Sequence, residues 1–378
     1  MNLKKALSIE DLRAMARKRV PRFVFDYVDG GSEDEVTLNA NRESFKRLRF
    51  RPRTLVDVSQ RNLGTTILGG PSALPVIAGP VGLLGLSWRH GDLEMARAAA
   101  AAGVPYGVST VSMHSLEDIA REAGGRLWFQ CYVFRERAVT EALIRRASTA
   151  GYEALIVTSD FAVSGKRERD LRSGLLPATK LTLPTKLDIL MHPRWLMTVA
   201  SQRPRFVNVE RELGAGRDAA SFLPLNMFDP ALDWDDFRRF RDLWKGKLLL
   251  KGVLRVDDAA RAVDCGADGV VLSNHGGRQL DGVISGMDVL PDVVREIRGR
   301  ASIIVDGGVR RGSDIAKALA SGAEAVILGR AVNYGLAAGG AAGVTRALDI
   351  LSDEFDRTLA LNGCRSSADL SPDLITTV

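Results

Sequence analysis

Eight short apolar runs, each ending in a polar or glycine residue, divide the chain between residues 74 and 330. They lie at residues 74–80, 104–110, 127–133, 154–160, 248–252, 269–274, 302–308 and 325–330. Runs that are apolar on both faces fit parallel strands covered by helices, and intervening stretches such as 91–103 and 310–322 resemble helices ended by glycine. The pattern therefore predicts eight repeated strand–helix units.

A weak internal repeat supports this count. Residues 150–160, 265–274 and 321–330 share a glycine that ends a helix, an acidic residue two positions later and a strand with a polar end. Three chance turns of similar composition are the alternative. We predict an α/β fold with a single (β/α)8 TIM barrel. The predicted parts are an N-terminal helical segment that caps the barrel (1–70), the barrel (71–350), an insertion between the fourth and fifth strands (177–224) and a C-terminal helix and tail (351–378).

Composition and charge exclude several classes of protein. The start of the chain is charged throughout, and no stretch offers about 18 uninterrupted apolar residues, so we expect neither a secreted nor a membrane-spanning protein. Cys131, Cys265 and Cys364 are widely spaced, which argues against a disulfide framework or a metal site. The net charge of +6 permits anionic substrates or a lipid surface, but no dense basic stripe interleaved with aromatic residues suggests nucleic acid binding. Residues 79–85 lack the glycine spacing of a dinucleotide-binding turn.

A parallel barrel collects the C-terminal ends of its strands at one mouth, where its active site lies. Two glycine-rich loops, 306–314 and 329–335, follow the seventh and eighth predicted strands. Backbone N–H groups beside glycines, helix N-termini, and Arg310 or Arg330 would together bind a phosphate. Tight turns with solvated arginines are the alternative.

The stretch SNHGGRQLDG, residues 273–282, follows the sixth predicted strand. His275 lies beside Gly276 and Gly277, which leave room for a ligand, and Arg278 can bind a carboxylate with two hydrogen bonds. An imidazole is a natural proton acceptor near neutral pH. A lone histidine is more often structural, but this position predicts a base beside a carboxylate clamp, as oxidation of a 2-hydroxy acid requires.

Several motifs, in order, resemble the FMN-dependent 2-hydroxy-acid dehydrogenase and oxidase family. They are LLLKGV (248–253), SNHGGRQLDG (273–282), DGGVRRGSD (306–314) and LGRA (328–331), and the resemblance extends from PRFVFDYVDGG (21–31) to GCRSS (363–367). Stretches such as RLWFQCYV (126–133), FAVSGKRERDL (161–171) and MHPRW (191–195) look most like the bacterial mandelate dehydrogenases, with the respiratory lactate dehydrogenases close behind.

The resemblance implies roles for individual residues. His275 would be the catalytic base, Asp160 would orient it, Tyr132 would contact the 2-oxygen region of the substrate, and Lys251 would lie near flavin N1 and O2. Tyr27, Arg167 and Arg278 would bind the substrate. The expected FMN contacts are Gly82, Ser109, Gln130, Thr158, Lys251, Ser273, Asp306, Gly308, Arg310, Gly329 and Arg330. No metal ligands are expected.

The resemblance predicts oxidation of an (S)-2-hydroxy acid to the 2-keto acid, with (S)-mandelate to benzoylformate favoured. Val111 stands where a bulky tryptophan is found in plant glycolate oxidases, and Gly82 stands where many oxidases have alanine. We therefore expect a large substrate and a quinone-type acceptor. An L-lactate dehydrogenase, an oxidase that uses O2, a phosphate-binding barrel isomerase or lyase, and a non-catalytic FMN-binding relative are the alternatives. Hydride and carbanion routes both stay open.

The insertion at 177–224 carries seven Lys or Arg against four Asp or Glu, interspersed with apolar residues and a tryptophan. That combination suits shallow insertion into an anionic bilayer surface, and the resemblance implies the same attachment. An active-site lid or a contact in the homotetramer expected of the family is the alternative. We expect a cytoplasmic protein, either free or bound peripherally to the inner face of the cytoplasmic membrane.

Overall fold

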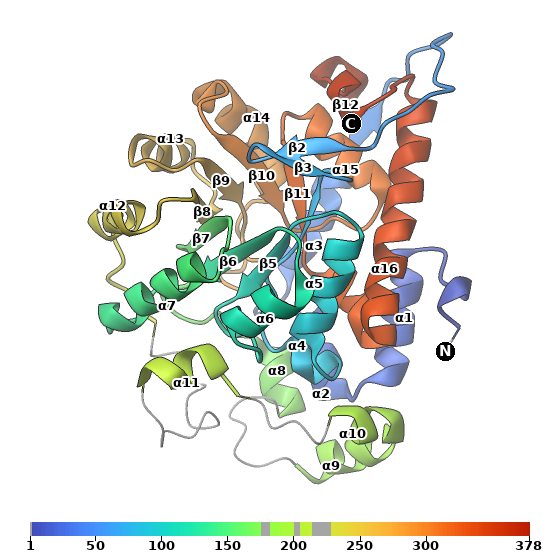
Figure 1. The fold of residues 1–378 in the computed structure, drawn as a ribbon. Coiled ribbons are helices and arrows are strands. Elements are labelled where there is room, and N and C mark those ends of the chain that lie inside the picture. The colour runs from blue at the N-terminus through green and yellow to red at the C-terminus, as the bar shows by residue number, and fades with distance from the viewer. Residues whose placement is uncertain (1, 175–181, 200–204, 214–227) are drawn as a thin grey trace.

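The structure, a computed structural model, describes residues 2–174, 182–199, 205–213 and 228–378. At its centre lies a closed barrel with the strand order β10-β11-β4-β5-β6-β7-β8-β9, in which every neighbouring pair is parallel (Figure 1). The strands are β4 (Val76–Ala78), β5 (Tyr106–Ser109), β6 (Leu127–Cys131), β7 (Ala154–Thr158), β8 (Lys247–Val253), β9 (Gly269–Leu272), β10 (Ser302–Asp306) and β11 (Ala325–Leu328). The predicted TIM barrel is confirmed, and each of the eight apolar runs coincides with one strand.

The barrel interior is filled by large apolar side chains that point inward from seven of the strands. They are Ile77, Trp128, Ile156, Leu249, Val271, Ile304 and Ile327, each at most 2% exposed. Inward-pointing branched side chains of this kind make such a barrel a packed core and not a pore. A hairpin of β2 (Thr65–Ile67) and β3 (Gly70–Ser72) adds Ile67 and Leu68 to the same cluster.

Helices surround the barrel on the outside (Figure 1). They are α5 (Gly91–Ala101), α6 (Leu116–Ala123), α7 (Arg137–Thr149), α12 (Trp234–Leu243), α13 (Val256–Asp264), α14 (Gly286–Ile297), α15 (Gly312–Ala320) and α16 (Arg330–Leu361). Local signals start and stop them: the Ser115 hydroxyl accepts a hydrogen bond from Asp118 N at the start of α6, and Gly124 ends that helix. The short helix α4 (Leu84–Ser87) follows β4.

The N-terminal segment lies against the barrel and the last helix. It contains η1 (Leu3–Lys5), α1 (Ile9–Arg19), α2 (Arg22–Asp29), α3 (Val36–Lys46) and β1 (Leu48–Phe50). Helix α1 packs along α16, and β1 pairs antiparallel with β12 (Ile375–Thr377), which follows η4 (Ser367–Asp369) and η5 (Pro372–Leu374). The predicted boundary at 70 and 71 falls inside β3, and the one at 350 and 351 falls inside α16, because these elements run across the limits suggested by sequence.

The predicted insertion contains further helices. After α8 (Glu168–Ser173) come α9 (Leu183–Leu190), α10 (Pro193–Val199) and α11 (Val207–Leu213). Figure 1 shows α9 and α10 at the lower end of the molecule and α11 beside the lower end of the barrel. Trp195 fixes α10 to the body, since its indole Nε1 donates to Leu86 O at 2.7 Å and its ring packs edge-on against Phe23. Residues 177–181, 200–204 and 214–224 of the insertion lie outside the described residues.

The packed barrel interior generates a stability prediction. Leu249→Ala removes a fully buried side chain from this interior and should lower the free energy of unfolding by about 2–5 kcal/mol. Leu361→Ala, at a position 76% exposed, should change it by less than about 0.5 kcal/mol. Chemical denaturation of both variants with intact cofactor measures the difference, and equal losses would contradict the assignment of Leu249 to a tightly packed core.

Candidate active site

Polar side chains line up where three neighbouring strands end. The register pairs Ser109 on β5 with Gln130 on β6, and Thr158 ends β7. Ser109 Oγ donates to Gln130 Oε1 at 3.2 Å, and Gln130 Nε2 donates to Thr158 Oγ1 at 2.8 Å. All three side chains are buried, so this hydrogen-bonded series fixes their orientation at the barrel mouth.

A second series continues on the next three strands. Lys251 Nζ donates to Ser273 Oγ at 2.9 Å, and Ser273 Oγ donates to Asp306 Oδ2 at 2.7 Å. The ammonium group also lies 3.1 Å from Asp306 Oδ2, while the Lys251 side chain is only 5% exposed. A buried cation is thus held at the mouth by one carboxylate and one hydroxyl.

The turn after β9 has an unusual backbone. His275, Gly276 and Gly277 all have left-handed φ angles, of 58°, 65° and 74°. A Cβ at Gly277 would lie 2.5 Å from Leu38 N, so only glycine fits there, and one at Gly276 would lie 2.7 Å from Arg330 Nη1 and would displace that guanidinium. His275 itself adopts a conformation that costs a non-glycine residue about 1 kcal/mol or more, which is typical of a functional position.

The His275 ring lies between an acid and a phenol. Its Nδ1 is 2.9 Å from Asp160 Oδ1, and its Nε2 is 3.0 Å from the Tyr132 hydroxyl. Because a carboxylate only accepts hydrogen bonds, Nδ1 carries the proton and Nε2 keeps its lone pair. Burial lowers the pKa of His275 below its ordinary value, against the opposing effect of Asp160. Burial works to raise the pKa of Asp160, but the hydrogen bond from His275 and the charge of Lys251 hold it below the ordinary value.

Two arginines converge beside His275. Arg278 Nη1 donates to Tyr27 O at 2.6 Å and to Gly30 O at 2.9 Å, and its guanidinium lies 4.9 Å from the centre of the Tyr27 ring. Arg167 Nε donates to Arg278 O, and burial together with the charge of Arg278 lowers the pKa of Arg167 to about 10. The buried Asp170 carboxylate lies 3.8 Å from Arg278 Nη2. Two buried cations facing one carboxylate leave a place for an anion.

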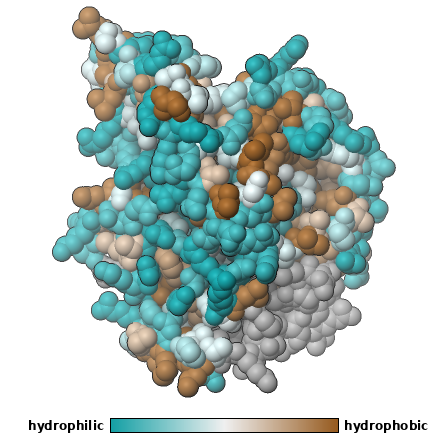
Figure 2. All heavy atoms as spheres, turned by 180° about the vertical axis from the view of Figure 1, so that it is seen from behind, coloured by the Kyte–Doolittle hydropathy of each residue, from teal (hydrophilic) through white to brown (hydrophobic). Residues whose placement is uncertain are grey.

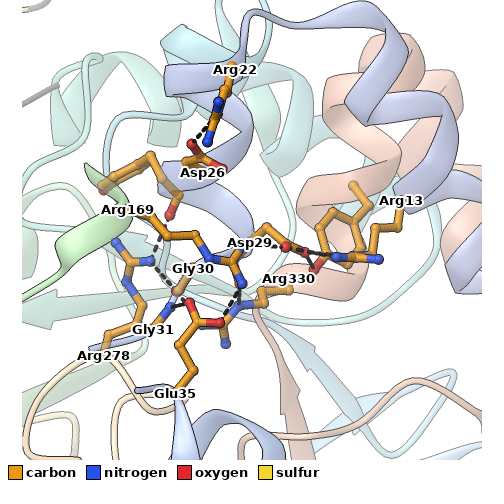
Figure 3. Close-up of polar contacts among 12 residues, drawn as sticks. Arg13, Arg22, Asp26, Asp29, Gly30, Gly31, Glu35, Arg169, Arg278 and Arg330 are labelled. Atoms are coloured by element: carbon orange, nitrogen blue, oxygen red, sulfur yellow. Dashed lines mark hydrogen bonds and ion pairs between the residues drawn. The ribbon is translucent and has the colours of Figure 1, made fainter. Parts of the chain in front are cut away.

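A cluster of ion pairs around Asp29 fixes the backbone whose carbonyls accept hydrogen bonds from Arg278 (Figure 3). Asp29 accepts from Arg13 of α1 at 2.6 Å, from Arg169 of α8 at 2.8 Å and from the Tyr334 hydroxyl at 2.7 Å. Burial works to raise the pKa of Asp29, but these hydrogen bonds hold it well below the ordinary value. Arg330 Nε donates to Asp29 O, so the same turn also anchors the start of α16. Sequence reasoning missed this cluster because its members lie far apart along the chain.

These groups surround one cavity, part of which opens to solvent. Among the residues predicted from sequence, those that line it are Tyr27, Gly82, Gln130, Tyr132, Thr158, Arg167, Lys251, His275, Arg278, Asp306, Gly308, Arg310, Gly329 and Arg330. Ser109, Asp160 and Ser273 stand behind the lining and hydrogen-bond to Gln130, His275 and Lys251. The structure therefore brings all the predicted site residues together.

Known proteins with similar sequences and structures point to the same kind of site. Residues 16–377 match the family described as FMN-dependent dehydrogenase. The chain belongs to this FMN-dependent dehydrogenase family. It is 45% identical to the (S)-mandelate dehydrogenase of Pseudomonas putida over 97% of this chain and 93% of that one, and 42% identical to an L-lactate dehydrogenase of Caulobacter vibrioides over 97% of both. The crystal structure of a monotopic membrane protein, (S)-mandelate dehydrogenase, superimposes with a TM-score of 0.95 at 43% identity, covering 99% of this chain and 100% of that one.

The FMN-dependent dehydrogenase family oxidises CH–OH donors, and its members use FMN. The cavity residues fit this cofactor. The buried Lys251 ammonium suits the flavin ring, where a fixed cation stabilises negative charge on reduction. Asn333 also lines the cavity, and its side-chain Oδ1 is buried without a hydrogen-bond partner, as expected where a cofactor supplies one.

The other end of the cavity fits the single phosphate of FMN. Gly308 and Gly329 line it near the starts of α15 and α16, where backbone N–H groups and the helix dipole favour an anion. Arg330 donates to the carbonyls of Asp29, Gly30 and Gly276, which leaves two of its five N–H groups for an anion. Burial lowers the pKa of Arg330 to about 10.

Sequence reasoning missed several residues of the site. Gln279 Nε2 donates to Asp160 O and its Oε1 accepts from Arg167, so it joins the orienting acid to the second arginine. Its position inside the SNHGGRQLDG motif was the signal that could have identified it. Asp170, three residues after Arg167, was likewise overlooked. Phe134 and Phe228, which also line the cavity, carried no local signal.

The His275–Asp160 pair generates a pH prediction. Asp160→Asn removes the group that raises the pKa of His275 and favours the tautomer with its proton on Nε2, the wrong nitrogen. We expect kcat to fall by about 100- to 10,000-fold and the acid limb of the kcat/KM profile to move to lower pH, with FMN retained. A stopped-flow pH series measures both, with His275→Ala as the control that removes the limb. An unchanged acid limb would contradict the coupling.

Proposed function

We propose that the protein oxidises an (S)-2-hydroxy acid with an aromatic side chain, best represented by (S)-mandelate, to the corresponding 2-keto acid. The observation that carries this proposal is a cluster of rings beside the base. Tyr132 lies 4.8 Å from both Phe161 and Phe228, and Phe228 lies 5.3 Å from Phe134, measured between ring centres. Such a wall stabilises a bound aryl group by edge and offset contacts.

The chain's own groups suit each part of that substrate. The cations of Arg278 and Arg167 bind the carboxylate, and the Tyr132 hydroxyl hydrogen-bonds to the oxygen on C2. His275 Nε2 accepts the proton that the substrate loses, and Asp160 stabilises the imidazolium that results. When bound, FMN supplies the two-electron oxidant.

Val111 and Gly82 affect the pocket differently from the sequence expectation. A Cβ at residue 82 would lie 2.5 Å from Val111 Cγ2, so the space left by Gly82 is used by Val111. Room for a large substrate is therefore better supported by the absence of a bulky side chain at 111 and by the ring cluster than by Gly82. Tyr27 donates to Gly82 O at 3.2 Å, which fixes this wall.

We also propose peripheral attachment to a membrane through α9 and α10. Leu183, Leu187, Leu190, Met191 and Met197 are 53–75% exposed. Lys186 and Arg194 are exposed on the same helices. Figure 2 is consistent with this, since apolar side chains appear at the lower left edge, where the turned view brings these helices. Apolar side chains beside basic ones suit an anionic bilayer surface. Among the described residues, no helix is both long and apolar enough to cross a membrane.

A membrane-bound position favours a quinone as the physiological acceptor, since quinones dissolve in the bilayer. The (S)-mandelate dehydrogenase that superimposes on this chain is itself described as a monotopic membrane protein. The alternative electron acceptor is O2, which the oxidases that this sequence resembles use. The homotetramer stays a prediction from the resemblance.

The ring cluster predicts a substrate preference. Purified protein should be yellow, and its flavin absorbance should bleach without oxygen when (S)-mandelate is added. In a panel with L-lactate and glycolate, mandelate should give at least about tenfold higher kcat/KM, because the aryl group fills a pocket lined by rings. A tenfold preference for L-lactate would instead favour the lactate dehydrogenase alternative.

The face of α9 and α10 predicts membrane binding. Leu187→Glu with Met191→Glu and Met197→Glu should abolish sedimentation with phosphatidylglycerol vesicles at low salt and leave FMN reduction by substrate intact. The control is Leu361→Glu, an equally exposed apolar position on α16, which should bind as the unmodified protein does. If the unmodified protein fails to sediment with these vesicles, a lid or subunit contact becomes the better account of the insertion.

A further inference from the structure

One polar side chain in the cavity wall has no part in the chemistry described above. Among the described lining residues, the other charged side chains lie beside the base and carboxylate site or at the FMN end. Glu210 belongs to neither group. It comes from α11, within the insertion, and its neighbours in the wall are apolar.

Glu210 lines the cavity on the same helix face as two apolar residues. Phe206, Val209 and Glu210 follow the i, i+3, i+4 spacing of one helix face, and all three line the cavity. Phe206 and Val209 are 7% and 5% exposed, and the Glu210 side chain is 19% exposed. The other two residues of this face are buried and apolar, so an acid at position 210 is the exception.

The carboxylate of Glu210 is held in place but not saturated. Its Oε1 accepts from Phe206 N at 3.1 Å, and its Oε2 lies 3.0 Å from Arg205 Nε and 2.9 Å from Arg205 Nη2. A carboxylate has about four acceptor positions, so one lone-pair direction is left for a ligand. Arg205 is 67% exposed on the solvent side and balances the charge of the acid.

We propose that Glu210 accepts a hydrogen bond from a hydroxyl group at the far end of the substrate's aromatic ring. This inference rests on the proposed function and narrows its substrate class to ring-hydroxylated aryl 2-hydroxy acids, such as 4-hydroxymandelate. A second carboxylate on the substrate would be repelled by Glu210. A cationic substituent would compete with Arg205, which already supplies one positive charge, whereas a neutral phenol needs only the free acceptor.

The test compares three substrates that differ in one ring substituent or in its position. In the unmodified holoenzyme, kcat/KM for 4-hydroxymandelate should exceed that for 4-methylmandelate, which has nearly the same size and no donor, by about tenfold to 100-fold. Comparing kcat/KM for the 3-hydroxy and 4-hydroxy isomers shows which ring position lies nearest the acceptor. Glu210→Gln keeps the bond from Phe206 N but loses the charge, and should lower the ratio several-fold. Glu210→Leu should bring the ratio close to one.

A matched control lies on the same helix. Glu212 pairs with Arg146 at 3.0 Å and is similarly buried, but does not line the cavity, so Glu212→Gln should keep the ratio of the unmodified protein. Because ring electronics are the same in every variant, a change in the ratio reports the contact with residue 210. If Glu210→Leu misfolds, Glu210→Gln and the unmodified protein still decide the matter.

Two outcomes would overturn the inference. A hydroxy-to-methyl ratio near one in the unmodified protein, or a high ratio that survives both Glu210 variants, would remove Glu210 from substrate selection while (S)-mandelate oxidation stands. Failure of (S)-mandelate and of all three ring-substituted acids to bleach the flavin would instead overturn the proposed function together with this inference. The two failures are therefore distinguishable in one set of anaerobic reductions.

Discussion

The site depends on the left-handed turn at residues 275–277. Because two of its residues have no side chain, the turn can pass directly against neighbouring backbone, and Gly277 O accepts from Ser32 N at 2.8 Å. Just before it, Asn274 exchanges two hydrogen bonds of 2.8 Å with Asn41 of α3. These contacts tie the end of β9 to the N-terminal segment, and they hold the His275 ring toward Asp160, which follows β7. A bulkier turn would separate the base from the segment that carries Tyr27.

The N-terminal helices are therefore part of the site and not only a cap on it. Asp29 joins α1, α2, α8 and α16 through its partners, and the adjoining carbonyls hold Arg278 and Arg330. Removing one member of such a buried group leaves an uncompensated charge, which is costly. The cluster therefore couples folding of the N-terminal segment to the geometry of both the carboxylate site and the phosphate end. Carboxylate binding and phosphate binding, which sequence assigns to separate motifs, therefore both depend on the turn at Asp29 and Gly30.

Sequence could predict what is encoded locally. Each strand is an apolar run with a polar end, and parallel pairing then forces Ser109, Gln130 and Thr158 together, so the barrel and most of its mouth follow from pattern and topology. The ring wall beside His275 does not follow. Glu210 reaches the cavity from the insertion and Phe228 from just after it, and the path of the insertion depends on long-range packing such as that of Trp195 on the body. The same limit hid Asp29 and its arginines, since no local spacing connects residues that lie up to 305 positions apart.

The charges of the site explain how binding and chemistry are kept separate. At the carboxylate end Arg167 and Arg278 carry two positive charges against the single negative charge of Asp170, so a substrate with one carboxylate restores balance there. Lys251 already has Asp306 as its partner. Asp160 differs, because its partner His275 is neutral before reaction and the pair becomes balanced only when the ring gains a proton. In the proposed reaction the anion is bound by fixed charges, the proton moves to a ring whose partner Asp160 already carries a negative charge, and the choice between substrates is left to the cavity wall.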